Sequence, residues 1–193
     1  MANKAKTRQV LVILGSPRRK GNSSTLAAWI SRGAKSAGAE VETVFLHRLK
    51  ISPCRGCDTC RKDDSQGCAI KDDMQQIYPK LIKAEAWVIA SPVYWFTMSA
   101  QTKIFMDRCY GLLAYGKNPF AGKRLAIAMS YGGEDPFTSG CVNALRTFQD
   151  AYRYAGCKIV GMVYGSATEA GEIANNTALM REAEELGQRL VTR

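Results

Sequence analysis

The sequence predicts an α/β domain in which a five-stranded parallel sheet is covered by helices on both faces. Apolar segments of strand length alternate with segments whose apolar residues recur at helical spacing. Strict alternation of this kind gives right-handed β–α–β crossovers. The apolar runs are also nearly continuous, as strands buried on both faces of a sheet must be. The expected strands cover residues 9–14, 41–46, 86–90, 124–129 and 157–164.

The expected helices fill the intervals between these strands. Residues 25–37 carry apolar side chains at helical spacing, and Gly38 follows as a stop. Asp72 is expected to cap the next helix, in which Pro79 produces a kink or ends the first turns. Further helices are expected over 99–113, over 138–155 and from about 171 onward.

Length and composition favour one folded domain over residues 1–193. A chain of 193 residues with 46% hydrophobic and 23% charged residues can bury a core without a metal or a disulfide as support. No apolar run is long enough to span a bilayer, and the first ten residues lack the apolar stretch of a signal peptide. We therefore expect a cytoplasmic protein with no membrane partner.

The formal net charge is +10, from 27 Lys and Arg against 17 Asp and Glu. A basic surface attracts phosphates, nucleotides, acidic proteins and nucleic acid alike. Apart from a group at Arg18, Arg19 and Lys20, however, the positive residues are scattered, and no nucleic-acid recognition motif is present. We expect no nucleic-acid partner. The single histidine, His47, also argues against a metal site built on several histidines.

The loop after the first strand, GSPRRKGNSST, has the composition of an anion site. It leaves a buried strand and enters a helix, so backbone N–H groups and the positive helix end meet there. Its hydroxyl groups and Arg18 add further donors. The loop matches neither the Walker sequence nor the G-x-G-x-x-G fingerprint. A plain helix cap on a solvated loop would use the same residues.

Two further loops follow the third and fourth expected strands. The first, SPVYWFTMS, places three aromatic residues in succession, which offer flat apolar walls for a ring system or pack on a neighbouring helix or subunit. The second, SYGGE, contains paired glycines that let the backbone approach a ligand closely. Informative loops after strands 1, 3 and 4 favour the flavodoxin-like strand order 2-1-3-4-5, with a ligand crevice at the carboxyl ends of strands 1 and 3.

Together these loops resemble the NADPH-dependent FMN reductase family over about residues 9–191. The resemblance implies an FMN cofactor. It places the phosphate near Ser16, Arg18, Asn22, Ser23, Ser24 and Thr25. It places the ribityl chain and the flavin ring near Pro92, Val93, Tyr94 and Trp95, and the pyrimidine end of the ring near Ser130, Tyr131, Gly132 and Gly133.

Four cysteines stand close together in a long loop over about residues 47–71, with the spacing C-x2-C-x2-C-x7-C. They are Cys54, Cys57, Cys60 and Cys68. In a cytoplasmic protein such a group favours metal or redox chemistry over structural disulfides. Four thiolates suit a [4Fe–4S] cluster or a structural zinc ion, and free or disulfide-forming thiols are the third interpretation. The motif resembles that of the iron–sulfur flavoprotein branch of the family. Cys109, Cys141 and Cys157 lie on expected helices and strands and are interpreted as buried residues.

The resemblance implies NAD(P)H-dependent reduction of FMN, a quinone or another small acceptor, with a [4Fe–4S] cluster relaying electrons if one is bound. Because flavin chemistry needs no protein acid or base, no catalytic side chain is assigned. A non-enzymatic electron carrier that serves a redox protein and a zinc-stapled binding module without flavin are the alternatives. A homodimer or homotetramer is expected.

Overall fold

The computed structural model describes residues 8–192. Two expectations from the sequence concern residues 1–7 and 193. They are the missing signal peptide and the full extent of the domain. Those residues lie outside the described range, so both expectations stay predictions. Within residues 8–192, no helix has the length and apolar character needed to cross a membrane.

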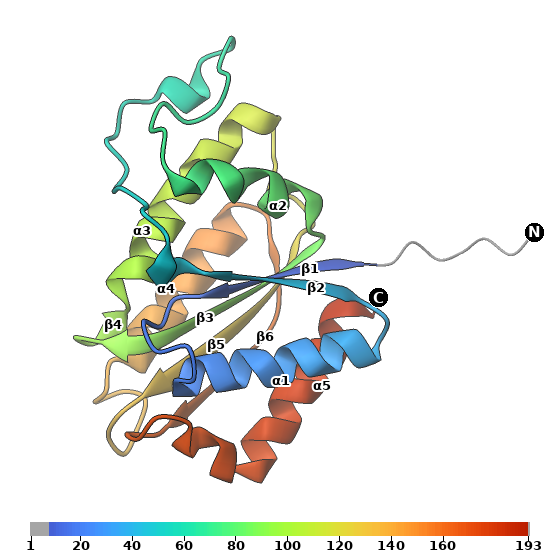
Figure 1. The fold of residues 1–193 in the computed structure, drawn as a ribbon, viewed down its shortest axis with the longest axis vertical. Coiled ribbons are helices and arrows are strands. Elements are labelled where there is room, and N and C mark those ends of the chain that lie inside the picture. The colour runs from blue at the N-terminus through green and yellow to red at the C-terminus, as the bar shows by residue number, and fades with distance from the viewer. Residues whose placement is uncertain (1–7, 193) are drawn as a thin grey trace, which may run out of the picture.

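Five parallel strands form the sheet in the order β2-β1-β3-β5-β6 (Figure 1). A short sixth strand, β4, pairs antiparallel with the end of β3. Without β4, the order is the flavodoxin-like 2-1-3-4-5, which confirms the prediction. The bounds are Gln9–Leu14 for β1, Glu40–Phe45 for β2, Ala86–Tyr94 for β3, Thr97–Met98 for β4, Arg124–Tyr131 for β5 and Lys158–Ser166 for β6.

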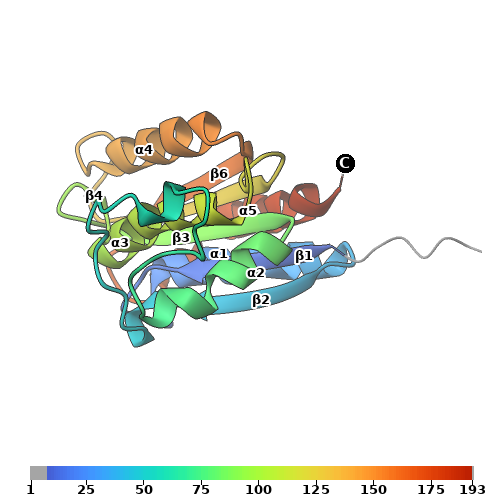
Figure 2. The same cartoon turned by 90° about the horizontal axis from the view of Figure 1, so that it is seen from above.

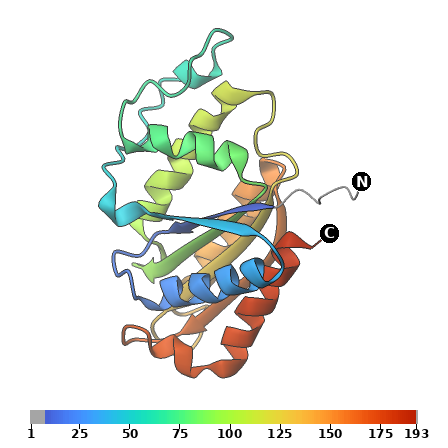
Figure 3. The same cartoon turned by 45° about the vertical axis from the view of Figure 1, so that its right-hand side comes forward.

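Helices cover both faces of the sheet (Figures 2 and 3). One face packs on α1 (Asn22–Ser36) and α5 (Thr177–Val191), and the other on α2 (Tyr78–Lys83), α3 (Ala100–Arg108) and α4 (Cys141–Tyr154). Side chains of β1 alternate between the two cores, because successive residues of a strand point to opposite faces. Val10 and Val12 enter the core under α1 and α5, whereas Leu11 and Ile13 enter the opposite core.

Three predicted elements are wrong in extent. Asp72 caps a 3-10 turn (Asp73–Gln76), and α2 begins only at Tyr78. Pro79 therefore lies in the first turn of α2, where its missing N–H costs no hydrogen bond, and it produces no kink. The helix expected over 99–113 ends at Arg108 and continues as a 3-10 helix (Cys109–Tyr115). The third strand extends beyond residue 90 to Tyr94.

Glycine is required where α1 and α5 cross. A Cβ atom on Gly187 would lie 2.0 Å from the carbonyl oxygen of Ile30, and one on Gly33 would lie 1.8 Å from that of Glu184. Contacts this short cannot form, so the two helix backbones approach more closely than any other residue would allow.

We expect Gly187→Ala to lower the free energy of unfolding by about 1–3 kcal/mol, the usual cost of overpacking. The sign is informative, because alanine is favoured over glycine in a helix by about 1 kcal/mol when nothing clashes. Glu185→Ala, at an exposed position of the same helix, is the control and should change stability by roughly 0.5 kcal/mol or less. Urea titration measures both, and a stabilised Gly187→Ala variant would contradict the packing described here.

Candidate functional site

A cavity of about 270 Å³ opens at the carboxyl edge of the sheet. We call it the strand-edge cavity. The loops after β1, β5 and β6 and the carboxyl ends of β3 and β5 contribute to it, as expected where the strand order reverses. Its lining residues are Ser16, Arg18, Gly21, Asn22, Ser23, Pro92, Val93, Tyr94, Ser130, Tyr131, Gly132, Ala167, Thr168 and Ala170.

The part of this cavity at the start of α1 has several features that suit an anion. A tight turn, closed by a hydrogen bond from the Gly21 N–H to the Arg18 carbonyl, brings the chain into the helix. The first turn of a helix leaves N–H groups without intrahelical partners, and the helix end carries partial positive charge. The Ser23 hydroxyl is buried there and has no hydrogen-bond partner among the described residues. A buried polar group without a partner indicates a missing ligand or water.

The structure brings most of the predicted ligand residues to this cavity, but not all of them. Ser24 and Thr25 do not line it, since their hydroxyls donate to the carbonyls of Arg18 and Gly21 within the turn. Trp95, whose surface is 92% exposed, and Gly133 also lie outside the lining.

Asn22 has a role that the sequence did not indicate. Its Nδ2 donates to the carbonyls of Ala167 and Glu169, at 3.3 and 2.9 Å, and its Oδ1 accepts from the Ile173 N–H at 3.3 Å. Asn22 thus ties the loop after β6 to the start of α1. No motif in the sequence marks the residues of that loop that line the cavity. The one general indication was that loops at the carboxyl ends of parallel strands lie close together at one edge of the sheet.

The aromatic loop forms a hairpin between β3 and β4 rather than an open turn. Trp95 and Phe96 occupy the left-handed region, with φ of 48° and 64°, which bulky residues rarely adopt. The hairpin is held against α4, because Asn143 Nδ2 donates to the Phe96 carbonyl at 3.3 Å. Gly140 must be glycine here, since a Cβ atom would lie 2.4 Å from the same oxygen.

A group of buried hydroxyls fixes the first turn of α3 to the ends of β1 and β3. Ser99 Oγ donates to the Gly15 carbonyl at 2.7 Å and accepts from the Thr102 N–H as the cap of α3. The Ser99 N–H donates to Ser91 Oγ at 3.0 Å. Ser91, Ser99 and Thr102 are fully buried, so the position of α3 relative to the strand-edge cavity is fixed.

The four cysteines of the loop line a second cavity, of about 30 Å³, which we call the cysteine cavity. Cys54 and Cys57 are exposed, whereas Cys60 and Cys68 are buried, and all four are free thiols. Across residues 8–192, no group of three or more His, Cys, Asp or Glu side chains is arranged to hold a metal ion. The rest of the wall comes from other residues of the same loop and from the end of α3 and the 3-10 helix that follows, including Arg108, Tyr110 and Gly111.

Hydrogen-bond donors reach the sulfur atoms of the loop. The Gly56 N–H donates to Cys54 Sγ, and Thr59 Oγ1 donates to Cys57 Sγ, both at 3.5 Å. The hydrogen bond from Thr59 lowers the pKa of Cys57, while burial raises the pKa of Cys60. The thiol of Cys57 therefore ionises more readily than the thiol of Cys60.

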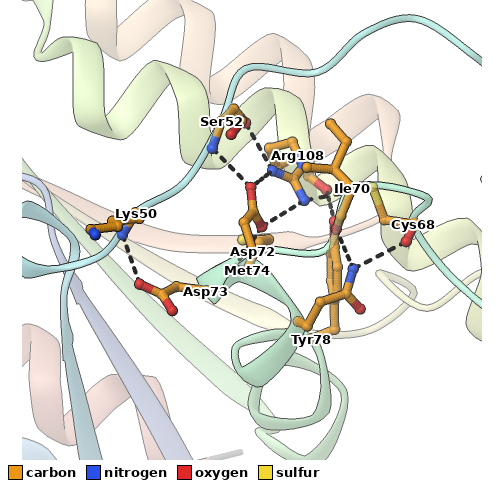
Figure 4. Close-up of polar contacts among 10 residues, drawn as sticks. Lys50, Ser52, Cys68, Ile70, Asp72, Asp73, Met74, Tyr78 and Arg108 are labelled. Carbon is orange, nitrogen blue, oxygen red and sulfur yellow. Dashed lines mark hydrogen bonds and ion pairs between the residues drawn. The ribbon is translucent and has the colours of Figure 1, made fainter.

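A buried ion pair anchors both ends of the cysteine loop (Figure 4). Arg108 Nη1 donates to Asp72 Oδ2 at 2.6 Å and to the Ser52 carbonyl at 2.8 Å, and Nη2 donates to Asp72 Oδ1 at 3.0 Å. Asp72 Oδ2 also accepts from the Ser52 N–H at 2.8 Å. Burial alone would raise the pKa of Asp72, but the hydrogen bonds from Arg108, Ser52 and Met74 outweigh burial and lower it.

The other three cysteines are buried, as the sequence predicted. Burial raises the pKa of Cys141 to about 12 and that of Cys157 to about 11, so both stay protonated at neutral pH. Burial also raises the pKa of Cys109. These residues are small core side chains, and none of them lines the strand-edge cavity.

Comparison with known proteins identifies the family. The family model described as NADPH-dependent FMN reductase matches residues 8–172. The chain belongs to this family. The NADPH-dependent FMN reductases are oxidoreductases that use FMN and NAD(P)H, and this chain is therefore an oxidoreductase with these cofactors.

Curated relatives place the chain in the iron–sulfur flavoprotein branch of the FMN reductases, which confirms the resemblance. An iron–sulfur flavoprotein of Methanocaldococcus jannaschii is 37% identical over 144 residues, which cover 75% of this chain and 70% of the relative. One from Archaeoglobus fulgidus is 31% identical over 181 residues, covering 92% and 76%. A putative NAD(P)H-dependent FMN-containing oxidoreductase of Bacillus subtilis is 24% identical and covers 94% and 97%.

Solved structures support the fold. An NAD(P)H:quinone oxidoreductase from Methanothermobacter marburgensis superposes with a TM-score of 0.74 at 19% identity, covering 97% of this chain and 98% of that one. A flavodoxin from Megasphaera elsdenii superposes with a TM-score of 0.58 at 16% identity, covering 94% and 97%.

We expect Gly140→Ala to displace the aromatic hairpin and to weaken FMN binding by about tenfold, or roughly 1.4 kcal/mol. Gly122→Ala is the matched control. Gly122 also has a positive φ, of 73°, but a Cβ atom there would meet nothing within 4 Å. Both variants should lose thermal stability through backbone strain, and only Gly140→Ala should change the dissociation constant, measured by quenching of FMN fluorescence. Equal affinities in the two variants would show that the hairpin does not shape the flavin site.

Proposed function

We propose that the chain oxidises NAD(P)H and reduces FMN, a quinone or another small acceptor, and that Cys54, Cys57, Cys60 and Cys68 hold a [4Fe–4S] cluster that relays single electrons. The observation that carries this proposal is the presence of two separate cavities, one suited to a flavin phosphate and one lined by four thiols. The names of the iron–sulfur flavoprotein relatives support the second part.

The strand-edge cavity suits FMN residue by residue. Ser16, Arg18, Ser23 and the first N–H groups of α1 would hold the phosphate, and the unpaired Ser23 hydroxyl is the donor that now lacks an acceptor. Pro92, Val93 and Tyr94 would line the ribityl chain and the ring. Ser130, Tyr131 and Gly132 would approach the pyrimidine end from β5. Asn22 keeps the loop after β6 in place, and Ser24 and Thr25 stabilise the phosphate turn from within.

Bound FMN would supply uptake of a hydride and release of single electrons, and the protein supplies binding and orientation. The half-exposed Tyr94 lines the cavity, and the exposed Trp95 and Phe96 follow it on the hairpin, outside the lining. Because Tyr94 is partly exposed, a nicotinamide or a quinone could stack beside it at the mouth of the cavity. Backbone N–H groups near Gly132 would stabilise negative charge that develops on the ring.

The cysteine cavity suits an anionic cluster. It combines four thiols, two hydrogen-bond donors to sulfur and a buried guanidinium at its wall. Four cysteine thiolates are the ordinary ligand set of a [4Fe–4S] cluster. A structural zinc ion would also take four thiolates. Iron and zinc analysis of the purified protein distinguishes the two.

A second candidate function is electron transfer to a redox protein. A groove of about 880 Å³ runs beside the cysteine cavity and is bordered by Cys54, Tyr110, Leu113 and the exposed Tyr154 of α4. A partner seated there would lie next to the exposed thiols. We further propose a cytoplasmic location and a homodimer or homotetramer. Sedimentation analysis would test the oligomeric state.

The first experiment is anaerobic purification with a visible spectrum and iron and zinc analysis. We expect flavin bands, broad absorption near 400 nm and about four irons per chain, since each thiolate of such a cluster binds one iron. Flavin bands without iron would leave a simple flavin reductase. One zinc and no flavin would leave a zinc-stapled binding module. Steady oxidation of NADPH or NADH with a quinone then separates an enzyme from a carrier that a protein partner must reduce.

Ser23→Ala should weaken FMN binding by about tenfold, because a charge-assisted hydrogen bond is worth roughly 1.5–3 kcal/mol. Riboflavin has no phosphate, so its affinity should not change. Ser31→Ala is the control, because Ser31 lies on the same helix and its hydroxyl donates to the Ala27 carbonyl within that helix. Isothermal titration with both flavins measures the effect. An equal loss for FMN and riboflavin would indicate general damage to the cavity instead of a lost phosphate contact.

A further inference from the structure

The guanidinium of Arg108 is buried beside the cysteine thiols and incompletely paired. Only 1% of Arg108 is exposed. Its Nη atoms bond to Asp72 and to the Ser52 carbonyl, and Nη2 also lies 3.6 Å from Cys68 Sγ. Arg108 Nε has no hydrogen-bond partner among the described residues. A buried charge of this kind is costly unless its surroundings compensate it.

The placement of Arg108 couples its charge to the cysteine cavity. Arg108 lines that cavity, and Nη2 joins Asp72 on one side to the sulfur of Cys68 on the other. The Asp72 side chain is only 10% exposed, so solvent screens neither charge effectively. Adding one electron to a metal centre makes the centre more negative. A nearby positive charge favours that reduced form, and a nearby negative charge opposes it.

We propose that Arg108 is a positioning residue that sets the reduction potential of the centre held by the four cysteines. Its hydrogen bond to Cys68 Sγ and its positive charge stabilise the reduced centre, and Asp72 offsets part of this effect. Hydrogen bonds to cluster sulfurs and local charge are established determinants of such potentials. The inference rests on the proposed function, because it requires a redox centre at Cys54, Cys57, Cys60 and Cys68.

The structure also explains why an arginine serves here. One arm of the planar fork meets the Asp72 carboxylate and the Ser52 carbonyl, while the other reaches both the carboxylate and the sulfur. A lysine would keep the charge but lose this geometry. The charge and the anchor are therefore separable by substitution.

The test is a redox titration of the anaerobically purified holoprotein, followed by electron paramagnetic resonance, in four variants. Arg108→Gln should shift the midpoint potential of the cluster to more negative values. The shift should be at least tenfold in the equilibrium constant, or about 59 mV for a one-electron couple. Asp72→Asn should shift the potential in the opposite direction. Arg108→Gln with Asp72→Asn should lie between the two single variants, and Arg108→Lys should lie closer to the unmodified protein than Arg108→Gln does.

The matched control removes the same charges from an exposed pair. Arg146 and Asp150 form an ion pair on α4, with side chains 73% and 61% exposed. Arg146→Gln and Asp150→Asn should each change the equilibrium constant by less than about twofold, because solvent and salt screen surface charges. If Arg108→Gln does not fold, Asp72→Asn still gives the sign of the charge effect, and Arg108→Lys tests the contribution of the hydrogen-bond geometry.

Three results would overturn the inference. The first is the same potential in Asp72→Asn, the Arg108 variants and the unmodified protein. The second is a shift in the same direction for Asp72→Asn and Arg108→Gln, which is what mere loosening of the anchor would cause. In both cases the unmodified protein still contains its cluster, so the proposed function survives. The third is an unmodified protein that holds no iron, which removes the proposed cluster and this inference together.

Discussion

The position of α3 is the constraint on which both cavities depend. Its first turn is fixed by Ser99, which caps the helix and also donates to the Gly15 carbonyl at the end of β1. Its last residue, Arg108, holds both ends of the cysteine loop. A helix of nine residues is about 13 Å long. The hydroxyls at its start are fully buried, and an unpaired buried hydroxyl costs about 1–3 kcal/mol. The helix cannot shift along its axis without breaking these bonds, so the two cavities keep a fixed relation.

The sequence predicted the sheet order and the loops that meet at its edge, because these follow from strand alternation and from local composition. It could not predict contacts between loops far apart in the chain. Asn22 looked like a phosphate ligand, since polar residues at a helix start usually face an anion. In the structure its side-chain amide nitrogen instead donates to the carbonyls of Ala167 and Glu169. Thr168 lines the strand-edge cavity, although nothing in its local sequence distinguishes that loop from an ordinary surface connection.

The errors in element bounds have a common physical cause. Apolar spacing records which side chains face the core, and it does not record how the backbone turns between them. Met74 in the 3-10 turn and Leu81 in α2 are both buried in the same core, so the apolar spacing of the segment predicted one continuous helix. The end of α3 was overestimated for the same reason, because Leu112 in the following 3-10 helix is fully buried. Arg108 itself carried no signal, since a lone arginine in a helical pattern normally faces solvent.

The anchor at Arg108 also holds the cysteine loop closed through protein contacts alone. It closes a loop between Ser52 and Asp72, which are 20 positions apart, without using any thiol. Closing a loop of this length costs about 2–3 kcal/mol of chain entropy. Here the contacts of Arg108 offset that entropy cost, so no metal centre is needed to close the loop. Zinc fingers differ, because they are unfolded without metal. If the proposed cluster is bound, the polypeptide can therefore fold before it acquires iron. Four free thiols that line one small cavity can also be oxidised in pairs by air.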